Sequence, residues 1–230
     1  MKDIYLKFIL IKKKIQNIIE ENNLPLKNIR IIAVTKNQNI NVIKEAISIG
    51  IKEFGENYIQ ESIIKIQKLK NYKNITWHFI GKIQSKKTKL IAQNFHWCQT
   101  IDRKKIAILL NKHRPKNLPR LNVLIQINSS QEKNKNGVCI KDYKQLAEEI
   151  YLMPHLNLRG IMAMPSINND PIINKVEYKK IKIAFQELKK QYISVDTLSL
   201  GTSFDIKQSL LSTSNMIRIG RCIFNKEKSF

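Results

Sequence analysis

Cysteine is scarce in this chain of 230 residues, and the pattern of the few cysteines excludes two common architectures. Only Cys98, Cys139 and Cys222 are present, far apart and odd in number. No CxxC pair and no Cys/His spacing typical of zinc sites occurs, so we predict neither a disulfide framework nor a metal site. We expect reduced thiols and therefore a cytoplasmic location.

Long hydrophobic runs are also absent. No stretch reaches the about 18 apolar residues that a membrane-spanning helix requires. Segment 1–14 resembles a signal peptide at first, but Lys7 interrupts its apolar run, and three lysines follow without a small-residue cleavage site. Its apolar residues recur at helical spacing, so we expect an N-terminal helix instead.

Glycine, proline and aromatic residues are few, which narrows the fold and the ligand. The chain has 7 glycines and 6 prolines, and no GxGxxG follows the first strand-like run, which disfavours a doubly wound dinucleotide fold. No proline-rich linker, repeat or low-complexity block suggests a second domain. Aromatic residues make up 7% of the chain, without the interleaved stacking platform of single-strand nucleic-acid binders.

Acidic residues are far fewer than basic residues, and this imbalance is the most conspicuous feature of the composition. The chain has 18 Asp and Glu against 41 Lys and Arg, a net charge of +23. Such an excess suggests a nucleic acid or an anionic membrane as partner. The lysines are scattered, however, and Lys, Asn and Ile are all residues of AT-rich codons. We therefore favour compositional drift and predict no specific nucleic acid and no membrane partner; a basic nucleic-acid or membrane-surface binder remains an alternative.

Short β-rich runs alternate with amphipathic helical stretches along the chain. Most of the runs are continuously apolar, which is typical of parallel strands covered on both faces. Their rhythm predicts an α/β fold, a (β/α)8 TIM barrel with an extra N-terminal helix, with a doubly wound sheet as the alternative. We expect one domain over 1–230: helix and linker 1–28, barrel 29–224, tail 225–230. The expected strands are 29–35, 53–57, 76–81, 97–101, 121–128, 158–164, 195–201 and 216–220.

Helical stretches are expected between these strands. Gly50 is a candidate C-cap for the first of them and Asp102 a candidate N-cap for the second. Segment 165–175 is the most loop-like part of the chain, and we predict a long loop on the working face of the barrel. The expected helices are 41–50, 102–112, 142–153, 176–192 and 205–213.

In a barrel, the active site gathers where strands end and loops begin. The turns after the seventh and eighth strands are the usual phosphate seat of this fold. Here "SLGTSFD" brings Ser199, Gly201 and Ser203, and "RIGRC" brings Gly220. Backbone N–H groups made accessible by glycine, with the dipole of a helix starting near Asp205, suit an anion.

Lys36 ends the first strand-like run, "IIAVTK". If this amine lies in a dry barrel mouth, desolvation and neighbouring cations make it nucleophilic near neutral pH. A lysine facing a phosphate seat suits an aldehyde that carries a phosphate, and pyridoxal 5′-phosphate (PLP) is the obvious candidate, bound as a Schiff base. Spacing alone does not distinguish this from a Schiff-base aldolase.

Several motifs resemble one family. "AVTK", "FGENYIQE", "WHFIGKIQSKK", "LRGIMAM", "LSLGTSFD" and "IRIG" follow one another in the order seen in pyridoxal phosphate homeostasis proteins, which are single-domain barrels similar to the barrel domain of alanine racemase. The resemblance covers about 29–224. It implies that Lys36 forms the Schiff base, that Arg218 faces the pyridine nitrogen, and that Asn57 lines the pocket. It also implies that Ser203, Gly220 and the backbone of Arg221 hold the phosphate.

Some positions depart from the family pattern. Arg221 stands where the family usually has threonine, Cys222 replaces a neighbouring small residue, and Asn225 replaces a glycine. The usual Asn-Lys after the third strand reads Lys86-Lys87. Arg221 could lend charge to the phosphate or crowd its seat, although its backbone N–H is kept in either case.

Two points argue against amino-acid turnover, so we predict no catalytic residues. Arg218 beside the ring nitrogen would keep it unprotonated and the ring a weak electron sink. A racemase also needs a second base, which a tyrosine-bearing second domain supplies; no such domain is expected here, and we interpret His78 as a core histidine. We predict a non-enzymatic, monomeric PLP carrier in vitamin B6 homeostasis, with apo PLP-dependent enzymes as partners. A low-activity racemase-like enzyme remains an alternative.

Overall fold

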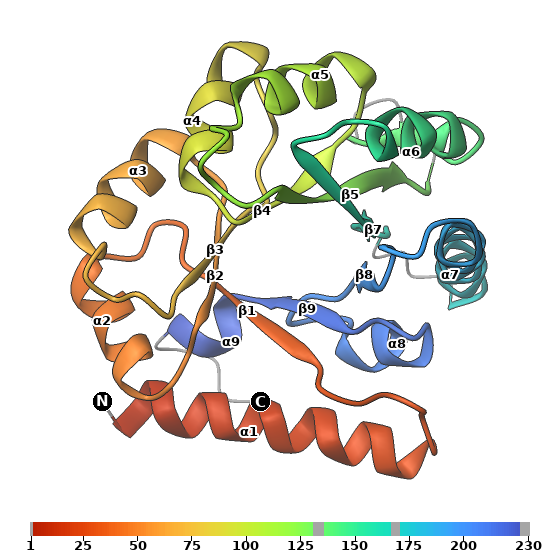
Figure 1. Ribbon diagram of the computed structural model, residues 1–230. Coiled ribbons are helices and arrows are strands. Elements are labelled where there is room, and N and C mark those ends of the chain that lie inside the picture. The colour runs from red at the N-terminus through yellow and green to blue at the C-terminus, as the bar shows by residue number, and fades with distance from the viewer. Residues whose placement is uncertain (1, 131–135, 167–170, 226–230) are drawn as a thin grey trace.

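Eight parallel strands close into a barrel in the computed structural model, which describes residues 2–130, 136–166 and 171–225 (Figure 1). Neighbouring strands pair in chain order, and the β4–β5 and β1–β9 pairings complete the ring. The predicted barrel is confirmed, and the alternative of an open doubly wound sheet is wrong. The barrel strands are β1 (Arg30–Val34), β2 (Glu53–Glu56), β3 (Thr76–Phe79), β4 (Trp97–Ile101), β5 (Leu121–Asn128), β7 (Leu156–Ala163), β8 (Thr197–Ser199) and β9 (Met216–Ile219).

One short strand was not expected. β6 (Val138–Cys139) pairs with the end of β5, beyond the residues of β5 that pair with β4. It extends the sheet at Ile127 and Asn128 and leaves the eight-stranded ring intact. A two-residue strand carries too little hydrophobic pattern to be recognised in the sequence.

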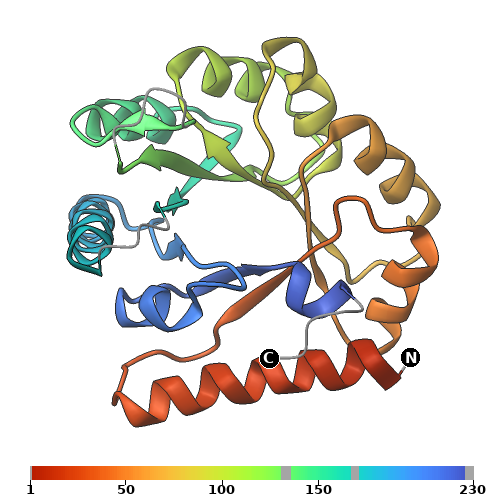
Figure 2. The ribbon, with the colours of Figure 1, turned by 180° about the vertical axis from the view of Figure 1, so that it is seen from behind.

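Helices surround the strands on the outside, as Figures 1 and 2 show from opposite sides. The first of them, α1, is the predicted N-terminal helix and packs against α8 and α9. The helices are α1 (Lys2–Glu21), α2 (Ile40–Ser48), α3 (Ile59–Lys68), α4 (Thr88–Asn94), α5 (Lys104–His113), α6 (Tyr143–Tyr151), α7 (Pro171–Gln191), α8 (Ile206–Leu211) and α9 (Arg221–Phe224), with a 3₁₀ turn, η1 (Ser85–Lys87), before α4.

The helix ends test two sequence expectations. Gly50 ends α2 as predicted: its φ is +90°, and the N–H of Ile51 reaches back to the carbonyl of Ala46, as in a Schellman motif. The prediction for Asp102 is wrong, because Arg103 occupies the N-cap position of α5. The Asp102 carboxylate accepts a hydrogen bond from the Arg103 guanidinium instead.

The loop predicted at 165–175 is shorter than expected. Helix α7 already begins at Pro171. Proline favours the first turn of a helix, because its fixed φ is helical and its missing N–H would have no partner there. Part of the predicted loop, 167–170, lies outside the described residues, as does 226–230 of the predicted tail.

Two hydrophobic clusters hold the barrel together. The larger one lies between strands and helices and contains most of the buried apolar side chains. The smaller one consists of inward-facing strand residues, namely Ile32, Trp97, Leu124, Met162 and Met216. Filling a barrel interior with layers of side chains is general for this fold. The polar residues buried beside this inner cluster belong to the site described below.

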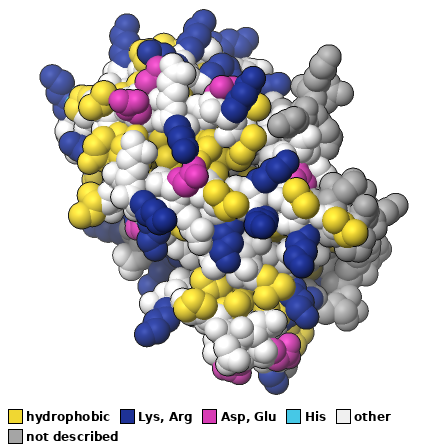
Figure 3. Space-filling view, turned by 90° about the vertical axis from the view of Figure 1, so that its right-hand side faces the viewer, with side chains coloured by type: hydrophobic (Ala, Val, Ile, Leu, Met, Phe, Trp, Pro, Cys, Tyr) yellow, Lys and Arg dark blue, Asp and Glu magenta, His cyan; other side chains and the backbone are white. Residues whose placement is uncertain are grey.

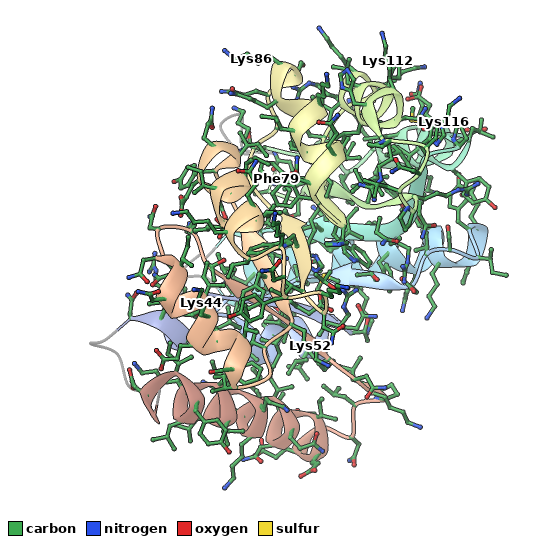
Figure 4. All side chains as sticks on the ribbon, turned by 60° about the vertical axis from the view of Figure 1, so that its left-hand side comes forward. Lys44, Lys52, Phe79, Lys86, Lys112 and Lys116 are labelled. Carbon is green, nitrogen blue, oxygen red and sulfur yellow. The ribbon has the colours of Figure 1, made fainter. Side chains whose placement is uncertain are left out.

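Positive charge is spread over the surface. On the face shown in Figure 3, Lys and Arg side chains alternate with apolar and acidic ones rather than forming one block. In Figure 4, Phe79 lies between strands and helices, Lys86, Lys112 and Lys116 lie at the upper margin, and Lys44 and Lys52 lie nearer the middle of the view. None of the described helices combines the length and the apolar character needed to cross a membrane.

Candidate functional site

A cavity of about 530 Å³ opens at the carboxyl ends of the strands. This is the end of the barrel where active sites of this fold lie, and the volume falls within the usual range for small-molecule sites. Residues at or after the ends of six of the eight barrel strands contribute to its wall. Among them are six of the residues predicted to bind the cofactor: Lys36, Asn57, Ser203, Arg218, Gly220 and Arg221.

Lys36 follows β1 and lines the cavity from its rim. Its side chain is exposed, and it forms no hydrogen bond or ion pair with any described residue. The expectation of a dry environment for this amine is therefore wrong. The physical reason is that β1 ends at Val34, so that Lys36 stands in the turn beyond the strand and not at its buried end.

Arg218, on β9, reaches the cavity from inside the barrel. Its Nη1 donates to Ser199 Oγ at 2.7 Å and its Nη2 to the carbonyl of Ala163 at 2.9 Å. Burial lowers the pKa of Arg218 to about 10, which still leaves the guanidinium charged at neutral pH. A fixed cation thus lies in the floor of the cavity.

Ser199 and Gly201 do not line the cavity but lie beneath it. Ser199 is fully buried on β8 and supports Arg218. The carbonyl of Gly201 accepts from the backbone N–H of Arg218 at 3.0 Å. Gly201 has a φ of +110°, and a Cβ at this position would approach Ser209 Cβ to 2.9 Å, so the turn requires glycine.

The loops after β8 and β9 form one side of the cavity. Ser203 lies in the first loop, and neither its N–H nor its hydroxyl has a partner among the described residues. Arg221 is the first residue of α9, so its N–H has no acceptor within the helix. The Arg221 guanidinium lies over the ring of Phe204, 5.1 Å from its centroid. Free donors and a cation on one wall favour an anionic group.

Asn57 lies across the cavity from these loops, directly after β2. Its Oδ1 is buried and has no hydrogen-bond donor among the described residues. A buried acceptor without a partner is costly, and in a cavity wall it indicates a donor supplied by a ligand. Gly81 makes this position possible, because a Cβ there would lie 2.0 Å from the Asn57 carbonyl oxygen.

Residues 13–227 match the family described as alanine racemase, N-terminal domain. A pyridoxal phosphate homeostasis protein of Buchnera aphidicola subsp. Schizaphis graminum is 63% identical over 227 residues, covering 99% of both chains. That of Escherichia coli K12 is 42% identical over 200 residues, 86% of each chain. The chain belongs to the pyridoxal phosphate homeostasis protein family.

Solved structures share the fold of this pyridoxal phosphate homeostasis family member. PipY of Synechococcus elongatus, solved with PLP bound, aligns with a TM-score of 0.83 and 23% identity, over 96% of this chain and 100% of that chain. Alanine racemase of Corynebacterium glutamicum aligns with a TM-score of 0.72 and 14% identity, over 98% of this chain and 62% of the racemase. These likenesses concern the barrel.

His78 is a core histidine in this homeostasis family member, as predicted. It is fully buried on β3 and does not line the cavity. Its Nε2 lies 2.6 Å from Glu53 Oε2, and its Nδ1 lies 3.0 Å from Gln99 Nε2. These contacts fit a neutral ring with the proton on Nε2, which donates to Glu53 while Nδ1 accepts from Gln99.

Phe204, Asp205 and Asn225 also line the wall, although none of them was predicted to contact a ligand. The sequence indicated Asp205 only as a helix start and Asn225 only as a departure from the family pattern. The Asp205 carboxylate accepts from the N–H and hydroxyl of Thr202 and from the hydroxyl of Tyr178, which keeps it engaged within the loop. Phe204 lies in the turn of the "LSLGTSFD" motif, where its residue type by itself does not indicate a ligand contact. No group of His, Cys, Asp or Glu suited to a metal occurs among the described residues.

Proposed function

We propose that this protein binds PLP through Lys36 and thereby takes part in intracellular PLP homeostasis. One observation carries the proposal: in the described structure, the fold brings a lysine amine without a partner and a wall of free hydrogen-bond donors to the same cavity, whose floor holds a fixed cation. The names of the relatives support the same ligand, as does the PLP-bound structure of PipY.

The residues present fit the functional groups of PLP. We propose that the Lys36 amine attacks the aldehyde, forming a C=N Schiff base with loss of water. Ser203, Gly220 and the backbone N–H of Arg221 would take the phosphate. Arg218 would face the pyridine nitrogen, with Ser199 and Gly201 holding its side chain and backbone in place.

Asn57 completes the proposed set of cofactor contacts. Its Oδ1 is an acceptor without a donor among the described residues, and PLP carries a hydroxyl group that can donate. The fit therefore rests on a feature of this chain, an orphaned buried oxygen in the cavity wall, as well as on the family.

We further propose that bound PLP does not turn over amino acids. PLP is a strong electron sink only when its ring nitrogen is protonated. The Arg218 guanidinium is charged at neutral pH and has N–H donors but no acceptor, so it cannot accept a hydrogen bond from a protonated ring nitrogen. Lys36 is the only amine among the described cavity residues, and no Tyr or His joins it there to serve as a second base. The alternative, a racemase-like enzyme of low activity, requires such a base.

A reversible carrier suits the chemistry of the ligand, because a free aldehyde reacts with amines at random. We propose that residues 1–230 act as one domain, as a cytoplasmic monomer that exchanges PLP with apo PLP-dependent enzymes as part of vitamin B6 balance. The three free thiols are compatible with a reducing compartment.

The test is spectroscopic. PLP-loaded protein should absorb near about 420 nm, as a protonated imine does, and borohydride reduction should leave the label on the peptide that contains Lys36. Lys36→Ala should remove both signals, whereas Lys44→Ala, on the exposed face of α2, should keep them. A colourless wild-type protein that takes up no PLP would contradict the proposal. Racemisation of alanine that depends on Lys36 would contradict its non-catalytic part.

A further inference from the structure

A second lysine lies near Lys36, but its ammonium group is fully hydrogen-bonded. Lys65, on α3, has a side chain that is only 4% exposed. Its Nζ donates to the carbonyl of Thr35 at 2.7 Å, to Glu56 Oε1 at 2.8 Å and to Glu61 Oε1 at 2.5 Å. An ammonium group has three protons, and all three are engaged. Lys65 is therefore unavailable to an aldehyde, in contrast to Lys36.

The partners of Lys65 are the groups that define the turn around Lys36. The carbonyl of Thr35 also accepts from the N–H of Gln38 at 3.0 Å, which closes a four-residue turn. The N–H of Asn37 donates to Glu61 Oε1 at 2.9 Å. Both neighbours of Lys36 are thus held by α3, while the side chain of Lys36 itself has no partner in the described part of the chain.

The hydroxyl of Thr35 strengthens this connection from the barrel side. It donates to Glu56 Oε1 at 2.6 Å, the oxygen that also accepts from Lys65. Glu56 closes β2 and is fully buried. The Glu56 carboxylate therefore connects Thr35, the residue before Lys36, to Lys65 on α3.

The turn needs such support. Asn37 has a φ of +61°, and a left-handed residue at the third position is what a type II turn requires. Lys36 occupies the second position, where its side chain projects from the corner. Asparagine tolerates this conformation better than most residues, but it is still uncommon and is maintained only where neighbours impose it.

The buried ion pair of Lys65 and Glu56 is a poor way to stabilise a protein core. Glu56 Oε2 has no partner among the described residues. Burial raises the pKa of Glu56, and the hydrogen bonds from Lys65 and Thr35 offset only part of this effect. A well-packed apolar group in place of such an ion pair is often equally stable or better. The arrangement is therefore better explained by what it orients than by what it stabilises.

We propose that Glu61 and Lys65 are positioning residues that hold the Thr35–Gln38 turn so that the Lys36 amine faces the aldehyde of PLP. This inference rests on the proposed function, because it concerns the same amine. It separates two parts of binding: α3 controls the covalent bond at Lys36, whereas the loops after β8 and β9, which carry Ser203 and Arg221, control the phosphate.

The separation can be measured with two ligands. PLP can form the C=N bond, whereas pyridoxine 5′-phosphate has an alcohol in place of the aldehyde and cannot. We expect Glu61→Ala to weaken PLP binding about tenfold, the size of one charge-assisted hydrogen bond, and to leave pyridoxine 5′-phosphate binding unchanged. Glu61→Gln should bind PLP more tightly than Glu61→Ala, because its amide oxygen still accepts from Asn37.

The matched control is Glu149→Ala. Glu149 is likewise a partly exposed helical glutamate paired with a lysine, on α6, and it does not line the cavity. Both ligands should bind this variant as they bind the wild type. Equal PLP affinity in Glu61→Ala and wild type, or an equal loss of both ligands, would overturn the positioning role.

A measurement without ligand keeps this inference separate from the proposed function. The amide of Asn37 should exchange with solvent faster in Glu61→Ala than in Glu149→Ala, because its acceptor is gone. An unchanged exchange rate would overturn the inference even if PLP binds. A wild-type protein that fails to bind PLP would instead contradict the proposed function, and the exchange experiment would still show whether Glu61 holds the turn.

Discussion

Arg218 Nη1 donates to Ser199 Oγ at 2.7 Å, and the same hydroxyl donates to Gln99 Oε1 at 2.7 Å. Because the serine proton is committed to Gln99, its lone pairs remain for the guanidinium. Gln99 is held in turn by its contact with His78. A chain of buried polar groups on β3, β4, β8 and β9 thus fixes the cation in the floor of the cavity.

Removing the Ser199 hydroxyl should have a measurable effect on stability. Ser199→Ala leaves Arg218 Nη1 without that acceptor in the barrel interior, so we expect a loss of about 1–3 kcal/mol in the free energy of unfolding. Urea denaturation measures this loss. Ser48→Ala is the control, because the Ser48 hydroxyl bonds only locally on an exposed helix end. Equal stability of the two variants would show that Ser199 is not needed to hold Arg218.

The buried ion pair of Lys65 and Glu56 has a predictable cost when one partner is lost. Lys65→Met leaves the Glu56 carboxylate buried and unpaired, so we expect stability to fall by about 3–5 kcal/mol. Replacing Glu56 by Gln in the same chain should restore part of it, since no charge is then left. Guanidinium denaturation of both variants is the measurement, and a double variant no more stable than the single one would argue against this account.

Stability should fall as the pH is lowered, in two successive ranges. Burial lowers the pKa of His78 from 6.5 to about 4, against the opposing effect of Glu53. Burial alone would raise the pKa of Glu53, but His78 and Arg30 outweigh it and lower the value from 4.5 to about 2. In both ranges the unfolded chain binds more protons than the folded one, so acid favours unfolding.

The contribution of His78 can be isolated by substitution. Wild-type stability, measured by urea denaturation across pH, should decline between pH 6.5 and 4 through His78, and between pH 4.5 and 2 through Glu53. His78→Asn should be flatter in the first range, whatever its absolute stability. An unchanged slope there would mean that other groups dominate the acid response.

Arg221 should help PLP rather than hinder it. Its guanidinium lies over Phe204 at the cavity wall, so it adds positive charge beside the proposed phosphate site. We expect Arg221→Thr to weaken PLP binding by about fivefold or less, as for an exposed ion pair, and to reduce its dependence on salt. Binding of pyridoxal, which lacks the phosphate, should be unaffected; tighter PLP binding by the variant would indicate crowding instead.

Much of the fold could be predicted because strands buried on both faces leave continuous apolar runs. All eight barrel strands coincide with the β-rich runs expected from the sequence, most of which are continuously apolar. Gly50 marked the end of α2, because glycine adopts a backbone conformation that few other residues adopt. Asp102 was a wrong prediction, because a capping residue type does not reveal which neighbour its carboxylate will contact. The start of α7 at Pro171 was missed because the prolines and asparagines of 165–175 are typical of loops.

Part of the candidate site could likewise be predicted from the sequence, and part could not. Lys36 and the turns around Ser203 and Gly220 were identifiable, since strand ends of a parallel barrel converge on one face. The supporting role of Ser199 was not, because a hydroxyl at a strand end can face the cavity or the neighbouring side chains. The hydrogen bonds from Glu61 and Lys65 on α3 to the turn that carries Lys36 also could not be predicted from the sequence.

By itself, the sequence determined the order of strands and helices and the presence of a lysine where the first strand ends, because these depend on local hydrophobic pattern and on chain order. Only the tertiary structure decided which of two nearby lysines has a free amine. That difference arises from burial: Lys65 is surrounded by three acceptors drawn from α3, β2 and the turn after β1, whereas Lys36 stands at the corner of that turn with no acceptor among the residues that the structure describes. Such a distribution of partners depends on segments that meet only when the barrel closes.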